Sequence, residues 1–70
     1  MNYKEILDEK AKRGFEEFIS FIRSDRNLLY EVDESENGET EVEVNIFDEN
    51  ECTDLIGYWN FDELGNYVVI

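Results

Sequence analysis

The sequence predicts an α+β fold in which one N-terminal amphipathic helix packs on a four-stranded antiparallel sheet. Apolar residues recur at helical spacing over residues 3–26, and after residue 26 their period changes to two, which is typical of half-buried strands. Turn sequences that contain Gly38 and Gly65 separate the first strand pattern from the second and the third from the fourth. A chain of 70 residues is long enough for one hydrophobic core, so we expect residues 1–70 to form a single domain.

The N-terminal segment carries the helix pattern. Its apolar stripe consists of Tyr3, Leu7, Ala11, Gly14, Phe15, Phe18, Phe21 and Ile22. Asn2 is followed three residues later by Glu5, as in a capping box at the start of a helix. Gly14 has a low helix propensity, and we expect it to allow close approach of the helix to the sheet. The pattern predicts one continuous helix over residues 3–26.

Four strand patterns follow, and a glycine sets the register of the first hairpin. The patterns cover residues 28–33, 41–46, 55–61 and 67–70. A three-residue loop that ends at Gly38 in the left-handed conformation pairs Val32 with Val42 and keeps each face of the hairpin consistent. A two-residue turn would pair Val32 with Glu43 and mix the faces, so we expect the longer loop.

The second hairpin and the two faces of the sheet follow from the same logic. The loop at residues 62–66 pairs Phe61 with Tyr67 and Trp59 with Val69. The helix would then cover a core face made of Leu28, Tyr30, Val32, Val42, Val44, Ile46, Leu55, Trp59, Phe61, Tyr67 and Val69. A simple meander has one covered side, so its outer face is left to solvent or to a partner.

The negative charge is confined to the sheet half of the chain. The net charge is −13, yet residues 1–26 hold all six basic residues together with six acids and are therefore neutral. Residues 27–70 hold the other thirteen acids and no Lys or Arg. A generally acidic protein would spread its acids over every exposed surface, so this distribution indicates a charged face. Such a face would repel nucleic acid and anionic membranes.

The expected register places like charges opposite one another on the outer face, with Asp33 beside Glu41 and Glu31 beside Glu43, which is destabilising. Alternate acids on a strand lie about 6.6 Å apart, on the order of the spacing of phosphates along a nucleic-acid backbone. The candidate partner-binding acids are Glu31, Asp33, Glu34, Glu36, Glu39, Glu41 and Glu43, with a second group at Asp48, Glu49, Glu51 and Asp54. We interpret them as a surface for a basic partner; the alternative is a solvated face that maintains solubility and blunts the sheet edge.

The same outer face carries an apolar set, which suggests an interface. Its members are Leu29, Phe47, Ile56, Tyr58, Val68 and Ile70. Tyr58 would adjoin Glu43, and an aromatic ring among carboxylates suits a site that binds arginine through a salt bridge and stacking. The alternatives are packing of these residues beneath the 48–54 loop and contact between two copies of the chain.

The residue types argue against an enzyme, a metal site and a cofactor. The chain has no histidine to act as the base of a hydrolytic triad or as a ligand of zinc or copper. Residues 33–38 match the first half of a calcium loop, but its twelfth position is Val44 rather than glutamate. Cys52 lies between acids, so we expect no reactive thiol there.

No apolar run approaches the roughly 18 residues of a membrane span. Acids begin at Glu5 and Asp8, where a secretion signal would be basic and then apolar. We therefore expect a cytoplasmic protein, in the host cell if a phage encodes it, that is a monomer or a weak homodimer and contacts neither membrane nor nucleic acid directly.

In its length, its separation of charge and its acidic hairpin within residues 27–70, the chain resembles the small acidic proteins that phages and mobile elements use against host nucleic-acid enzymes. Anti-CRISPR proteins, anti-restriction proteins and uracil-glycosylase inhibitors belong to this class, and their acid clusters occupy a site meant for nucleic acid. The resemblance implies an inhibitor, with anti-CRISPR activity as the best single expectation, that binds a basic groove and blocks entry of DNA or RNA.

Two other functions agree with the same residues. An immunity protein or antitoxin that neutralises a basic nuclease would use the same electrostatics, and genomic neighbours would separate it from a phage inhibitor. A subunit or adaptor would instead dimerise through the apolar outer patch, and its dimer should survive high salt.

Overall fold

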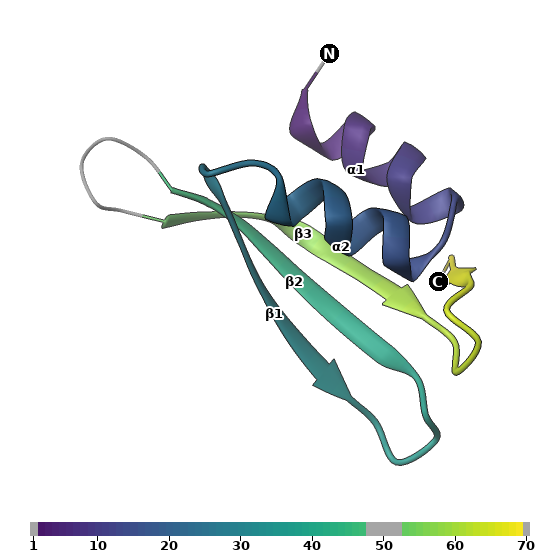
Figure 1. Ribbon diagram of the computed structural model, residues 1–70. Coiled ribbons are helices and arrows are strands. Elements are labelled where there is room, and N and C mark those ends of the chain that lie inside the picture. The colour runs from purple at the N-terminus through teal and green to yellow at the C-terminus, as the bar shows by residue number, and fades with distance from the viewer. Residues whose placement is uncertain (1, 48–52, 70) are drawn as a thin grey trace.

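The computed structural model describes residues 2–47 and 53–69 (Figure 1). In chain order the elements are α1 (Tyr3–Lys12), α2 (Phe15–Arg23), β1 (Leu28–Glu34), β2 (Thr40–Phe47), β3 (Thr53–Phe61) and β4 (Tyr67–Val68). The strands form one antiparallel sheet in the order β1-β2-β3-β4, which confirms the α+β class and the four-stranded meander. Both helices cover the same face, with α2 against β1 and α1 against β3. No helix of the described residues is long and apolar enough to cross a membrane.

The prediction of one helix over residues 3–26 is wrong, because the chain breaks into two helices at Gly14. Its φ of 118° and ψ of 166° lie outside the helical region, and they would be strained for any residue with an L side chain. The backbone N–H of Phe15 donates to the carbonyl oxygen of Gly65 at 2.8 Å, which fixes the start of α2 on the turn between β3 and β4. The close approach expected at Gly14 is therefore made to a turn and not to a strand.

Local hydrogen bonds define the outer ends of the helix pair. Asn2 Oδ1 accepts from the backbone N–H of Glu5 at 2.9 Å, which confirms the predicted cap. Tyr3 Oη donates to Asp25 Oδ2 at 2.7 Å and ties the first turn of α1 to the segment after α2. This hydrogen bond raises the pKa of Tyr3.

The predicted register of the first hairpin is confirmed. Val32 pairs with Val42, Gly38 has a φ of 83°, and the N–H of Ser35 donates to the carbonyl oxygen of Glu39 at 2.8 Å. This hairpin extends beyond the helices (Figure 1). Val32 lies on the helix face but is 39% exposed, so its assignment to the core is wrong.

The second hairpin is shorter than predicted. Phe61 pairs with Tyr67 as expected, and Gly65 has a φ of 84°. Strand β4 ends at Val68, so the expected pairing of Trp59 with Val69 is not part of the ladder. Val69 is 77% exposed and does not belong to the core.

A β-bulge between β2 and β3 reverses the predicted faces of two residues. Val44 pairs with Gly57 and Asn45 with Leu55, so Ile56 is the extra residue of the bulge. Ile56 therefore packs against the core, and Leu55 is 51% exposed on the outer face. The prediction of Leu55 as core and Ile56 as outer is wrong, because one extra residue shifts the alternation by one.

The core is an aromatic cluster between the helices and the sheet. Its buried residues are Leu7, Ala11, Phe18, Ile19, Ile22, Leu28, Val42, Val44, Trp59 and Phe61. The ring of Phe18 lies 5.4 Å from that of Trp59 and 5.2 Å from that of Phe61, measured between centroids. Trp59 Nε1 donates to Asp8 Oδ1 at 2.7 Å, so the one polar atom of the buried indole has a partner.

Phe18→Ala should lower the free energy of unfolding by about 3–5 kcal/mol, because it empties the fully buried centre of the aromatic cluster. Urea denaturation followed by circular dichroism measures the change. Leu64→Ala is the control, since Leu64 is 82% exposed and its truncation should have little effect. An unchanged midpoint for Phe18→Ala would show that the core lies elsewhere.

Gly14→Ala should lower the free energy of unfolding by roughly 1–2 kcal/mol, since alanine is strained at a φ of 118°. In one continuous helix the same substitution would instead raise stability by roughly 1 kcal/mol. The sign of the change in urea denaturation therefore distinguishes two helices from one.

Candidate protein-interaction surface

The outer face of the sheet carries two parallel rows of acids, which we call the acidic rows. Across β1, β2 and β3 they read Glu31–Glu43–Tyr58 and Asp33–Glu41–Asn60. The cross-strand pairs and the neighbouring positions of Glu43 and Tyr58 are as the sequence predicted. Neighbouring strands lie about 4.8 Å apart, and alternate residues of one strand lie about 6.6 Å apart. The four carboxylates therefore project from one small area of the face.

The described residues supply no cation to the acidic rows. The ion pairs among residues 2–47 and 53–69 join Lys12 to Glu9 at 3.6 Å and Arg13 to Glu17 at 3.9 Å, both within the helical layer. Apart from the hydrogen bond that the Tyr58 hydroxyl donates to Glu43, repulsion between the facing acids is relieved within this part of the chain by solvent and salt.

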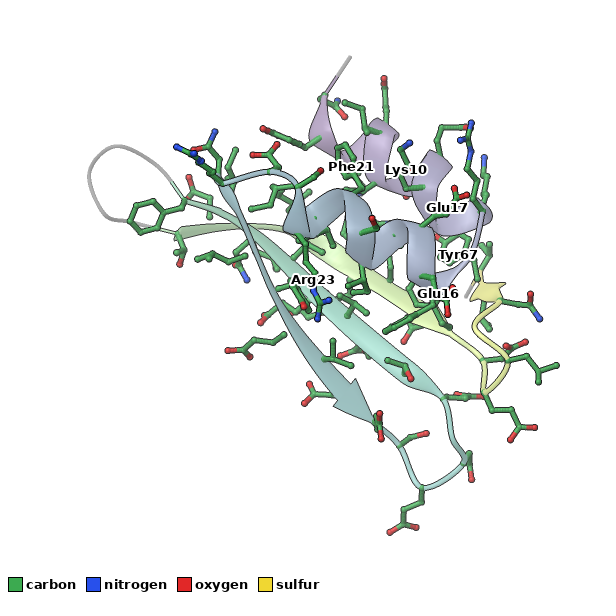
Figure 2. The ribbon with its side chains drawn as sticks, in the orientation of Figure 1. Lys10, Glu16, Glu17, Phe21, Arg23 and Tyr67 are labelled. Atoms are coloured by element: carbon green, nitrogen blue, oxygen red, sulfur yellow. The ribbon has the colours of Figure 1, made fainter. Side chains whose placement is uncertain are left out.

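Cations on the helical layer are engaged on that side of the molecule. Lys10 Nζ lies 5.7 Å from the centre of the Phe21 ring, and Arg23 Nε donates to Tyr30 Oη at 2.9 Å. Figure 2 shows Arg23 pointing from α2 toward the sheet, while side-chain oxygens line the hairpin away from the helices. The two sides of the sheet therefore differ in charge.

Tyr58 is an exposed aromatic ring held beside the acids. Its hydroxyl donates to Glu43 Oε1 at 3.2 Å, and the side chain is 52% exposed. The hydrogen bond to Glu43 and the negative charge of that carboxylate raise the pKa of Tyr58. The resulting contribution to stability is present below the ordinary pKa of 10.0 and is lost as pH rises through the raised value. At neutral pH a guanidinium can stack on the phenol ring and contact Glu43.

An apolar row adjoins the acidic rows. It reads Leu29–Asn45–Leu55, followed by the pair of Phe47 and Thr53. Leu29, Leu55 and Phe47 are 44%, 51% and 42% exposed. Of the predicted apolar set, Leu29, Phe47, Tyr58 and the half-buried Val68 are on this face, Ile56 faces the core, and Ile70 lies outside the described residues. Leu55 takes the place of Ile56, and no sequence signal indicated the bulge that exposes it.

Three other acids of the first hairpin do not belong to the acidic rows, although Glu34 and Glu39 line the same shallow depression as Asp33 and Glu41. Glu34 pairs with Thr40 and so belongs to the helix face, while Glu36 and Glu39 are exposed at the turn. The hairpin tip is therefore acidic on both faces of the sheet.

Of the second predicted acidic group, Asp54 is among the described residues, and it does not join this surface. Asp54 pairs with Ile46 and is exposed on the helix face, at the end of β3 away from the hairpin tip. Asp48, Glu49 and Glu51 lie outside the described residues.

Asn60 is a member of the surface that sequence reasoning missed. It pairs with Glu41 and lines a shallow depression with Asp33, Ser35 and Thr40. Its place followed from the alternation that puts Tyr58 on the outer face, since the two residues are two positions apart. An amide here adds a hydrogen-bond donor beside the carboxylates.

Among residues 2–47 and 53–69, no cluster of three Asp, Glu, Cys or His side chains is placed to hold a metal ion. Comparisons with protein-family models, curated proteins and solved structures found no match. The function is therefore inferred from the chemistry of this surface.

Glu41→Gln, and likewise Glu43→Gln, should leave the free energy of unfolding unchanged or raise it by up to about 1 kcal/mol, because each removes one cross-strand repulsion. The gain should be larger at low salt, where screening is weaker. Urea denaturation at low and high salt measures it, with the exposed helix variant Glu16→Gln as control. A clear loss of stability would show that these carboxylates make bonds the fold requires.

Proposed function

We propose that this protein is an inhibitor that places its acidic rows in the basic nucleic-acid groove of a host enzyme and thereby excludes DNA or RNA, with anti-CRISPR activity the first case to test. One observation carries the proposal. Four outward carboxylates face one another across β1 and β2 without a cation from the described residues, and the exposed ring of Tyr58 stands beside them.

The cost of placing like charges together supports a partner of opposite charge. Lysine and arginine side chains in a groove would relieve the repulsion of Glu31 with Glu43 and of Asp33 with Glu41 on binding. A carboxylate spacing of roughly 5 by 7 Å on a twisted sheet offers such cations a regular set of acceptors. Opposite fields also steer association, so the encounter should be fast and should slow steeply with salt.

Tyr58 supplies a contact that charge alone does not. An arginine that stacks on its ring keeps one face of the guanidinium away from water while bonding Glu43. We expect Tyr58→Ala to raise the dissociation rate more than it lowers the association rate, because stacking acts after encounter.

An immunity protein or antitoxin that neutralises a basic nuclease would use the same contacts and would differ only in the enzyme it meets. A different candidate, a dimeric adaptor, is favoured by the exposed apolar row of Leu29 and Leu55 with Phe47. Its dimer would persist at high salt in gel filtration, whereas binding through the acidic rows would be lost.

The partner can be found by capture from a lysate of the host cell at low salt and elution with rising salt. The captured enzyme, its nucleic acid and this protein then enter a competition assay. We expect the protein to displace the nucleic acid. An enzyme that holds both at once would contradict mimicry and would leave an allosteric or scaffolding role.

Neutralising the acidic rows by Glu31→Gln, Asp33→Asn, Glu41→Gln and Glu43→Gln together should abolish binding while the circular dichroism spectrum is retained. The control variant carries Glu5→Gln, Glu9→Gln, Glu16→Gln and Glu17→Gln, which remove the same charge from the two helices. It should bind nearly as well as the parent. Unchanged binding by the first variant would show that the acids only maintain solubility, and the apolar row would become the surface to test.

A further inference from the structure

Strand β1 is an edge of the sheet, and its outer side is open. The sheet order places β2 on one side of β1 and no strand of the described residues on the other. An unpaired edge presents backbone groups on which another extended chain can add as a strand.

The phase of the ladder tells which backbone groups face outward. The N–H of Phe47 donates to the carbonyl oxygen of Asn27 at 2.7 Å at one end of the hairpin, and the bond from Ser35 to Glu39 closes the other. Because hydrogen-bonded pairs alternate along an antiparallel ladder, Leu29, Glu31 and Asp33 direct their backbone groups to β2. Tyr30 and Val32 then direct theirs to the open edge, and no backbone group of residues 2–47 and 53–69 is bonded to them there.

The side chains along this edge define what would fit. Glu31 and Asp33 stand on the outer face on either side of the outward backbone groups of Val32, whose side chain is 39% exposed on the helix face. We infer that the β1 edge accepts, by strand addition, an extended segment of a basic partner that carries Lys or Arg at alternate positions and an apolar residue between them. The cations would lie beside Glu31 and Asp33, and the apolar side chain beside Val32.

Charge excludes a second copy of this chain from the same edge. Antiparallel pairing of β1 with itself about its centre would place Glu31 against Glu31 of the second copy, and each chain carries a net charge of −13. Among the described residues, the stretch of β3 before Asn60 is also open on one side, but the bulge at Ile56 interrupts its alternation. Acids on β1 thus select a basic strand.

This inference goes beyond the proposed function, since an added strand need not belong to an enzyme that binds nucleic acid. The test therefore uses a synthetic probe in place of the enzyme. The probe is a fluorescent peptide of about seven residues, the length of β1, in which Lys or Arg alternates with valine. Two further versions carry N-methyl groups on the amides of either the basic residues or the valines. Each retains the charge, but only one of them blocks the amides that would face β1.

Fluorescence anisotropy should show that the parent peptide binds. One methylated version should bind with an affinity lowered roughly tenfold or more, and the affinity of the other should be nearly unchanged. Hydrogen exchange of the Tyr30 and Val32 amides should slow on binding, while those of Leu29 and Glu31 are already bonded to β2. The double variant Glu31→Gln with Asp33→Asn should lower the affinity for the peptide at least roughly tenfold at low salt. The control variant Glu9→Gln with Glu16→Gln should leave that affinity nearly unchanged.

Equal binding of both methylated peptides, or no slowing of exchange at Tyr30 and Val32, would overturn strand addition. Absence of binding by the parent peptide would overturn it as well. These results involve no enzyme, so they are distinct from a failed competition assay, which would contradict the proposed groove blocking and leave the edge site intact.

Discussion

Burial of Trp59 is the constraint on which the rest of the structure depends. The indole fills the space that a side chain at Gly57 would need, since a Cβ there would lie 3.3 Å from its ring. Its nitrogen requires an acceptor, and Asp8 provides one only if α1 lies over β3. The ring also needs cover, which Phe18 gives from α2. One residue thus determines that both helices occupy the same face of the sheet.

Because the core occupies one face of the sheet, the other face is available for the acidic side chains. Six basic residues are on the segment that contains the helices, and thirteen acids are on the segment that contains the sheet. Because the helices cover one side only, Glu31, Asp33, Glu41 and Glu43 lie on the other side, and Glu36 and Glu39 lie at the hairpin tip. The molecule therefore has a strongly polarised field, which gives it a preferred orientation toward a basic surface before contact.

The sequence was sufficient for features that depend on local alternation and turn chemistry. Gly38 and the period of two predicted the first hairpin, and with it the facing acids and the place of Tyr58 beside Glu43. The break at Gly14 was not predictable from the apolar stripe, since the same stripe suits one helix or two. It is decided by a contact with Gly65, which is distant in sequence. The bulge at Ile56 likewise had no signal in the sequence, and it places Leu55 on the outer face. Val32 was misplaced because strand alternation does not show where the helices end.

The extension of the first hairpin past the helices makes the protein thinner at one end than at the other. The body consists of a helical layer on a sheet, whereas the first hairpin beyond the helices is a single-layer ribbon, in which β3 pairs with β2 as far as Thr40. A channel too narrow for the whole domain can still admit this ribbon. The width of the opening, and not only its charge, then determines how far the protein enters, so that single-strand channels and wide duplex grooves would be sealed to different depths.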